Sequence, residues 1–344
     1  MANSFFKTLT SADRTQSRTL LHENIPVTGT LLSGTYAANS SGREINIKTF
    51  SHGMFQSVYD YPHVSSSANH ILDLTSGFST HSTSLSSSTT SQKAKKVNIY
   101  NQMAQVLVGY DTGSNIRAFD ADGNFANDGV KYHNAIFVNF SRLLVKDEIK
   151  KGSFSMLLGT GSAYLSAFSD TIEVKDTDAA TSYKTNSPAG EYGILKNGDA
   201  SVGLVYYQAG IAVLTSSVFG ATTGIDASNR SHEQMLTGST IDEFADGIRH
   251  RIQNISFNNT TELNSTIFFC RANHDEFNYS SNPTYLSGSK IVVKDNEPLN
   301  LPRAYVTTVG LYSPDNELMA VAKVSEPLRK DPTNELTLRV RLDY

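Results

Sequence analysis

The chain has 344 residues, of which 39% are hydrophobic and only 18% are charged, and its formal net charge is −4. This balance leaves no basic excess to attract nucleic acid or an anionic membrane, so neither is expected as a partner. The many Ser, Thr, Asn and Gly residues favour strands and turns over helices. We therefore expect a mainly β (α+β) protein with antiparallel β-sheets or a sandwich, about two amphipathic helices and an extended N-terminal arm.

Two features of the sequence indicate the cellular compartment in which the protein is expected to occur. The one cysteine, Cys270, cannot form an internal disulfide, which fits assembly in a cytosolic environment. It alternates with Phe268 and is expected to act as a small apolar side chain in a strand. No window approaches eighteen apolar residues, so no transmembrane helix is expected.

Residues 1–95 are expected to form the extended arm, or an irregular β region. Residues 44–50 alternate apolar and polar side chains, which predicts a short strand, and residues 65–74 predict a short helix with a serine cap. Residues 76–92 are dominated by Ser and Thr. That composition predicts a flexible loop or linker that orders only against a partner.

Residues 97–110 carry a clear helical pattern. Their apolar side chains recur at the spacing of one helix face, and the predicted face consists of Ile99, Met103, Val106, Leu107 and Tyr110. The lysines of the preceding KAKK segment, residues 93–96, are predicted to form a solvated entrance to this helix.

Residues 111–129 consist largely of turn-forming residues and contain the segment DADGN, residues 120–124. Alternate oxygen-bearing side chains beside a glycine suggest a calcium loop, but an EF-hand loop needs glycine at its sixth position and glutamate at its twelfth. When Asp120 is counted first, Gly123 is fourth and Lys131 is twelfth. An ordinary turn explains the same residues, so the sequence leaves calcium binding by Asp120, Asp122 and Asn124 open.

The middle of the chain predicts a series of strands. Residues 135–145 and 153–159 predict a hairpin or two neighbouring strands, and residues 171–176 predict another strand. Residues 201–219 predict two strands that turn near Gly210. Their apolar content on both faces indicates burial between layers.

Residues 241–253 predict the second helix. Thr240 and Glu243 match a capping box at its start. Arg249 and Arg251 are expected to point away from the core. The predicted buried face consists of Ile241, Phe244, Ile248 and Ile252.

The last hundred residues are the most regular. Residues 304–312, 318–325 and 335–344 predict strands, and the last of these alternates one buried and one wet face. As a terminal edge strand it could also pair with another subunit. We expect a β-rich core over residues 96–344, with a subdomain boundary near residues 225–240 as an option.

No complete catalytic motif is visible, and an enzyme is not expected. The nine histidines show no metal-ligand spacing, and neither a P-loop nor a nucleophile elbow occurs. The adjacent acids Asp147 and Glu148, and Asp275 and Glu276, are explained as turn residues. We therefore assign no catalytic, cofactor-binding or metal-binding residue.

Five segments resemble virion structural proteins from the tail and baseplate of contractile-tailed (myovirus) phages, in particular T4-like marine and cyanobacterial phages. Together they cover about a third of the chain, all from residue 96 onward. They are KVNIYNQMAQVLVGYD, FVNFSRLLVKDEIKKGSFSMLLG, VGLVYYQAGIAVLT, DGIRHRIQNISFNNTTELNSTIFFCRANHDEFNYSSNPTY and AYVTTVGLYSPDNELMAVAKVSEPL.

The resemblance implies a structural component of the virion, most of all a wedge-type baseplate protein that acts through protein–protein contacts and needs no cofactor. Its partners would be other phage structural proteins, in multiple copies of a symmetric assembly put together in the host cytoplasm. One alternative is a receptor- or carbohydrate-binding virion protein, and another is a neck- or head-associated structural protein. For carbohydrate binding the candidate stacking residues are Tyr59, Tyr61, Tyr279 and Tyr285.

The segment DEFNYSSNPTYL, residues 275–286, is the candidate contact loop. A proline keeps the preceding residue extended, and Asn and Ser side chains can bond their own backbone to hold an irregular path. Its aromatic side chains can then fix the loop to a sheet or to a neighbouring protein. The candidate residues are Phe277, Tyr279, Asn282, Pro283 and Tyr285.

Overall fold

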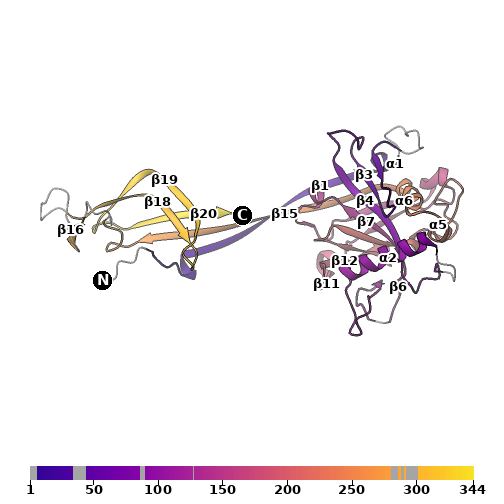
Figure 1. Cartoon of the computed structure of the whole chain (residues 1–344), viewed down its shortest axis with the longest axis horizontal. Coiled ribbons are helices and arrows are strands. Elements are labelled where there is room, and N and C mark those ends of the chain that lie inside the picture. The colour runs from indigo at the N-terminus through magenta and orange to yellow at the C-terminus, as the bar shows by residue number, and fades with distance from the viewer. Residues whose placement is uncertain are drawn as a thin grey trace. The chain divides into compact units, whose positions relative to one another are not determined.

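The computed structural model is mainly β, with 44% strand and 19% helix, as the composition predicts. The chain forms two compact units (Figure 1): unit 1 holds residues 1–19 and 262–344, and unit 2 holds residues 20–261. Two long strands, β1 (Arg14–Thr28) and β15 (Ile252–Ala272), contribute residues to both units. The structure describes residues 6–33, 44–85, 90–126, 128–279, 286–287, 290–291 and 301–344.

The division into units does not follow the expected boundaries. We predicted one boundary near residue 95, with a second near residues 225–240 as an option, but the chain passes between the units at residues 19/20 and 261/262. Both crossing points lie within long strands. No linker composition marks such a position, so it could not be found by searching for flexible segments.

Unit 2 is built on one antiparallel sheet with the strand order β2-β3-β4-β7-β14-β13-β12-β10-β9-β15, and β1 lies next to β15 at that end of the sheet. Two short strands join it at the side, because β11 pairs with β12 and β8 pairs with β15. The remaining pair, β5 with β6, forms a separate small ladder. The strand bounds are β2 (Ile47–Thr49), β3 (Gln56–Tyr59), β4 (His70–Phe78), β5 (Phe119–Asp120), β6 (Lys131–Tyr132), β7 (Asn134–Phe140), β8 (Glu148–Ile149), β9 (Ser155–Gly159), β10 (Thr171–Lys175), β11 (Lys184–Ser187), β12 (Gly190–Asn197), β13 (Ala200–Tyr206) and β14 (Ile211–Thr215).

The sheet of unit 2 curls until distant strands face each other. Five strands separate β7 from β15 in the sheet order, yet the ring centroids of Phe140 on β7 and Phe257 on β15 are 5.1 Å apart. Phe140 also contacts Phe154 at 5.9 Å. The concave side therefore encloses a core lined by strands from both ends of the sheet, which we call the inner cluster.

Alternate residues of the central strands serve two different cores. On β7, Ile136 and Val138 belong to the inner cluster, whereas Ala135 and Phe137 belong to a second core that contains residues of helix α2, which we call the helix-side cluster. The same alternation holds for Leu204 and its neighbours on β13. This confirms that residues 201–219 form two strands that are buried on both faces.

The helices of unit 2 differ from the predicted ones in their length and in which of their residues are buried. Helix α6 begins with the predicted capping box of Thr240 and Glu243, but it ends at His250, and Ile252 already belongs to β15. On α2 the side chain of Val106 is 63% exposed, whereas Tyr100 is buried. The helix bounds are α1 (Gly29–Ser33), α2 (Ser91–Leu107), α3 (Arg142–Val145), α4 (Ala179–Ser182), α5 (His232–Gly238) and α6 (Ile241–His250), with 3-10 turns η2 (Tyr164–Ser169) and η3 (Ser216–Val218).

The Ser/Thr-rich segment is not a flexible loop where the structure describes it. Its first residues complete β4, its last residues begin α2, and residues 86–89 lie outside the described part. Ser79 and Ser82 are buried, and hydrogen bonds from their hydroxyl groups to His133 and Asn134 respectively offset the cost of that burial. The prediction of a short helix over residues 65–74 is also wrong, since β4 begins at His70.

Two segments that we expected to form adjacent strands do not pair with each other in the sheet. We expected residues 135–145 and 153–159 to form a hairpin or adjacent strands. Strand β7 instead pairs with β4 and β14, while β9 pairs with β10 and β15.

Unit 1 is assembled mostly from the C-terminal part of the chain. The C-terminal half of β15 pairs with β20 (Leu336–Asp343), and β18 (Ala304–Tyr312) pairs with β19 (Leu318–Lys330) in a hairpin. These strands confirm the predicted regular C-terminal region. The unit also contains η1 (Ser11–Asp13) and the short pair β16 (Leu286–Ser287) and β17 (Lys290–Ile291).

At Gly77 the backbone of α2 lies close against β4. A β-carbon on this residue would lie 2.5 Å from the carbonyl oxygen of Lys96 and 2.8 Å from the backbone nitrogen of Tyr100. We therefore expect Gly77→Ala to push the helix off β4 and to lower the free energy of unfolding by about 1–3 kcal/mol, as overpacking does. Urea unfolding of unit 2 measures the change. Gly238→Ala is the matched control, because a β-carbon there meets nothing within 4 Å, and equal losses in the two variants would contradict this account.

Candidate assembly surface on unit 1

The described residues of unit 1 bury almost none of their apolar side chains. Among its described residues Val340 is the one buried hydrophobic residue, while every other buried hydrophobic residue of the described chain lies in unit 2. On the face that carries Val340, β15 and β20 pair Phe268 with Val340 and Cys270 with Leu338, yet Phe268, Cys270 and Leu338 remain only half-buried. A stable unit of this size buries its apolar sheet faces against another layer, so the apolar faces of unit 1 are incompletely covered.

The β18–β19 hairpin contributes a second group of exposed apolar side chains. Tyr312 and Leu318 face each other across the two strands, as do Gly310 and Val321. A β-carbon on Gly310 would lie 2.9 Å from the Tyr312 ring and 3.3 Å from the Leu318 side chain, so these residues gather around the glycine. The Phe6 ring meets the Tyr312 ring edge-on at 4.9 Å.

We call Phe6, Tyr312, Leu318 and Val321 the hairpin patch. Their exposed fractions are 50%, 47%, 53% and 53% respectively. Single exposed apolar residues are common on protein surfaces, but a contiguous group of them marks an interaction site. The hairpin patch is therefore the candidate contact surface of unit 1.

The strands of unit 1 also present open edges. Strands β18 and β19 pair only with each other among the described strands, and β20 pairs only with β15. Each of the three strands thus has a row of backbone groups that no described strand bonds. Such an edge is able to accept a strand from another chain.

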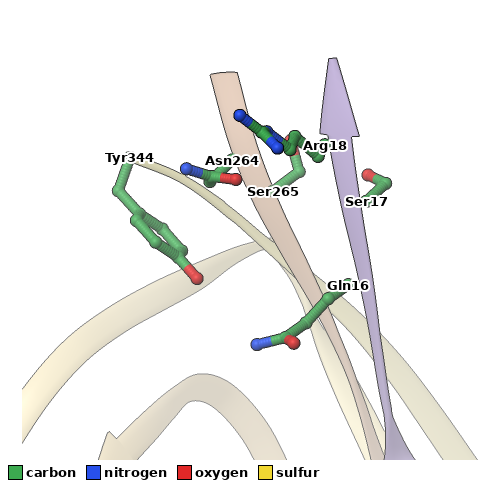
Figure 2. A pocket seen from close by; sticks show the side chains of 6 residues that line it. All are labelled: Gln16, Ser17, Arg18, Asn264, Ser265 and Tyr344. Carbon is green, nitrogen blue, oxygen red and sulfur yellow. The ribbon is translucent and has the colours of Figure 1, made fainter. Parts of the chain in front are cut away.

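Unit 1 also has a shallow polar recess between residues of β1, β15 and the C-terminal residue (Figure 2). It has a volume of about 220 Å³ and is lined by Gln16, Ser17, Arg18, Asn264, Ser265 and Tyr344. Arg18 is its one charged residue, and it pairs with Glu262. No nucleophile stands beside a base among these six residues, so the recess suits hydrogen bonding to a polar partner and not covalent chemistry.

The described half of the predicted contact loop is an anchored turn. Phe277 is 43% exposed and takes a φ of 55°, a left-handed conformation that a bulky residue adopts only when its surroundings hold it there. Tyr279 is half-buried. Asn282, Pro283 and Tyr285 lie outside the described residues, so their part in the loop remains a prediction.

A buried lysine that sequence reasoning missed holds this turn in place. Lys330 is fully buried at the end of β19, and its ammonium group donates to Asn278 Oδ1 at 2.6 Å, to the Asp331 carbonyl at 3.0 Å and to the His274 carbonyl at 3.3 Å. Asn278 Nδ2 in turn donates to the His274 carbonyl at 2.7 Å. Burial lowers the pKa of Lys330, and nearby carboxylates oppose that shift. No motif in the sequence signals this role.

The tyrosines proposed for sugar stacking do not form one platform in the described structure. Tyr59 is half-buried and packs against His63 and His70. Tyr61 is 53% exposed and lies in unit 2, whereas Tyr279 belongs to unit 1. Tyr285 lies outside the described residues.

The two arginines that we expected to point away from α6 are among the most buried side chains of unit 2. Arg249 donates to the Leu32 carbonyl, to Glu44 Oε2 at 2.8 Å and to Asp246 Oδ1 at 3.1 Å. It therefore ties α6 to segments that lie more than 200 residues earlier in the chain.

Arg251 is fully buried and bonds three main-chain carbonyls. Its guanidinium donates to Gly159 at 3.0 Å, to Gly161 at 2.7 Å and to Gly224. The prediction failed because the helix ends at His250. Residue 251 lies beyond the helix, so the helical periodicity of 3.6 residues per turn does not determine the direction of its side chain.

A lysine on α2 caps α5. The Lys96 ammonium group, 1% exposed, donates to the carbonyls of Leu236 and Ser239 at 2.7 Å and of Met235 at 3.2 Å. A cation at a helix C-terminus satisfies carbonyls that have no partner within the helix. The predicted solvated entrance is therefore wrong for Lys96 and also for Lys93, which is buried. Burial lowers the pKa of Lys96 to about 8.

The described residues show no assembled reactive site. Burial raises the pKa of the Cys270 thiol, which disfavours the reactive thiolate. No group of three or more His, Cys, Asp or Glu side chains in the described part of the chain is placed to hold a metal ion. None of the helices described here is long and apolar enough to cross a bilayer.

Comparison with known proteins finds no match, whether among family models, curated proteins or solved structures.

The pKa of Lys96 predicts a pH dependence for the stability of unit 2. The folded value is about 8, against 10.5 for a free lysine, so between these two values the unfolded state binds more protons and the free energy of unfolding rises with pH. From about pH 8 to pH 10 we expect a gain of roughly 2 kcal/mol in the wild type relative to Lys96→Met, measured by urea unfolding. Lys95→Met is the control, because Lys95 bonds only the His52 carbonyl at an exposed site. The same pH slope in the wild type and in Lys96→Met would refute the assignment.

Proposed function

We propose that this protein is a structural component of a multi-protein particle, and that unit 1 is the part that binds its neighbours. The observation that carries the proposal is the lack of buried apolar side chains in unit 1, where Val340 stands alone among the described residues. A second protein surface would cover the hairpin patch and the half-buried faces of β15 and β20. The function of the chain is then its contacts and no reaction is assigned to it.

The sequence resemblance supports a more specific form of this proposal. The segments that resemble tail and baseplate proteins of contractile-tailed phages include 304–328, which contains Tyr312, Leu318 and Val321 of the hairpin patch. We therefore propose a tail baseplate component of the wedge type, located in the virion and built in several copies with other phage structural proteins.

Two features of the chain make unit 2 the scaffold and unit 1 the contact module. Unit 2 contains both apolar clusters and is locked by the buried cations Lys96, Arg249 and Arg251. Unit 1 combines the hairpin patch, open strand edges and a polar recess. An interface with an apolar centre and a polar rim is the usual form of a stable protein–protein contact.

The hairpin patch should be needed for assembly and not for folding. The double variant Tyr312→Thr/Val321→Thr removes apolar surface while threonine keeps the β-propensity of the strands. We expect at least about a tenfold loss of incorporation into purified particles, because truncation of central interface residues commonly costs more than 1 kcal/mol. Quantitative mass spectrometry of the particles measures incorporation, and far-UV circular dichroism of the purified variant should match the wild type.

Leu165→Thr is the matched control, since Leu165 is 97% exposed on η2 of unit 2. This variant should enter particles at the wild-type level. Normal incorporation of the double variant would contradict a contact role for the hairpin patch. Absence of the wild-type protein from purified particles would contradict the proposed function itself. Binding of the isolated protein to host glycans would favour the receptor-binding alternative.

A further inference from the structure

The loop between β5 and β6 has the layout of a calcium loop. An EF-hand loop takes its ligands from positions one, three, five, seven, nine and twelve, with the main-chain carbonyl used at position seven. Counted from Asp120, the first five of these positions are Asp120, Asp122, Asn124, Ala126 and Asp128. Asn127 lies outside the described residues.

The backbone of this loop also has the turn that calcium loops need. At position six, where an EF-hand has glycine for a sharp turn, Phe125 takes a φ of 57°. Its amide donates to Asp120 Oδ2 at 3.0 Å, and the Asn124 amide donates to Asp122 Oδ1 at 3.0 Å. Phe125 is buried and stacks on Tyr192 at 5.5 Å, which holds a conformation that a phenylalanine otherwise avoids.

Two carboxylate oxygens converge inside the loop. Asp120 is fully buried, and its Oδ1 atom has no hydrogen-bond partner. A β-carbon on Gly129 would lie 3.8 Å from both Asp120 Oδ1 and Asp122 Oδ2, so both oxygens face Gly129, and Asp122 Oδ2 also accepts a hydrogen bond from Asn124 Nδ2 at 2.7 Å. A buried carboxylate group needs a cation or several hydrogen bonds beside it.

Lys131, at position twelve, brings that cation. Its ammonium group lies 2.8 Å from Asp120 Oδ2 and also donates to the carbonyl of Ala126, the main-chain ligand of position seven. Asp120 and Lys131 are cross-strand partners in the β5–β6 ladder. The lysine therefore reaches the loop from the position where a calcium loop has its bidentate glutamate.

We propose that the Lys131 ammonium group occupies the ion position of a calcium-type loop, so that the chain itself supplies the cation. The loop then keeps its conformation without a divalent ion. Replacing the lysine by an oxygen ligand would turn the same loop into a calcium site.

The order of this loop matters to the core of unit 2, which provides a readout. The carbonyl of Gly123 accepts hydrogen bonds from Tyr192 Oη at 2.8 Å and from Asn186 Nδ2 at 3.0 Å. Phe125 and Tyr192 both belong to the helix-side cluster. Loss of the cation should therefore lower the unfolding temperature of unit 2.

Lys131→Glu tests the proposal, because it removes the ammonium group and places a carboxylate at position twelve. In EDTA we expect its unfolding temperature to fall by about 5 °C or more, since it leaves a buried carboxylate without its partner. Addition of about 5 mM calcium should recover most of this loss. Isothermal titration calorimetry should show one bound calcium ion in Lys131→Glu and none in the wild type.

Three controls separate this result from a simple loss of an ion pair. Lys131→Met should lose stability without recovery by calcium, and Asp122→Ala combined with Lys131→Glu should lose the recovery. Lys196→Glu makes the same charge change at the exposed pair with Asp178 and should show no calcium response. If Lys131→Glu does not fold, Lys131→Gln replaces it, because its amide oxygen is a neutral ligand at position twelve.

Two outcomes would overturn the proposal. Calcium binding by the wild type would mean that the ion itself, and not Lys131, is the natural occupant. Absence of any calcium recovery in both Lys131→Glu and Lys131→Gln would mean that residues 120–131 form an ordinary turn.

Discussion

The uneven burial of apolar side chains is the constraint on which the structure depends. Unit 2 closes its curled sheet around the inner cluster, where Phe140 and Phe257 meet from strands far apart in the sheet order. Unit 1 has long strands with the same alternation, but Val340 is the one hydrophobic side chain that its described residues bury. Apolar burial supplies most of the free energy that offsets chain entropy. The two units therefore have very different means of staying folded.

Buried cations add a second constraint, because each of them bonds main-chain carbonyls. Arg251 bonds three carbonyls, Lys96 bonds three at and just beyond the end of α5, and Lys330 bonds two beside the predicted contact loop. Removing a charge from water is costly unless several hydrogen bonds replace its hydration. Such a cation fixes the position of the segments it joins, since few other arrangements offer three converging carbonyls. Lys131, which is half-buried, bonds one carbonyl, that of Ala126, together with the Asp120 carboxylate group.

Local patterns in the sequence predicted where helices and strands occur better than they predicted which strands pair. Thr240 and Glu243 marked the start of α6, and alternation marked β20, because capping and strand periodicity depend on residues close in the chain. The pairing of β7 with β14 and of β9 with β15 depends on contacts between residues far apart in the chain. No short window contains that information.

The candidate surface was predicted only in part, for similar reasons. Phe277 and Tyr279 are described in the predicted loop, but the hairpin patch forms because Phe6 from the N-terminal region meets Tyr312 from β18. The outward positions of β18 and β19 carry Tyr312, Leu318 and Val321 where polar residues are usual, and that signal was available in the sequence. Buried polar residues misled us, since Ser82 and Arg251 are accommodated by partners that only the fold brings near.

Amide hydrogen exchange on the isolated chain and on assembled particles tests the central claim most directly. If a partner protein is needed to cover the apolar surface of unit 1, the amides of β18, β19 and β20 exchange much faster than those of β7 and β13 in the isolated chain. Assembly into the particle then slows the exchange of these amides. If β18, β19 and β20 in the isolated chain exchange as slowly as β7 and β13, unit 1 is stable without a partner and the account is contradicted.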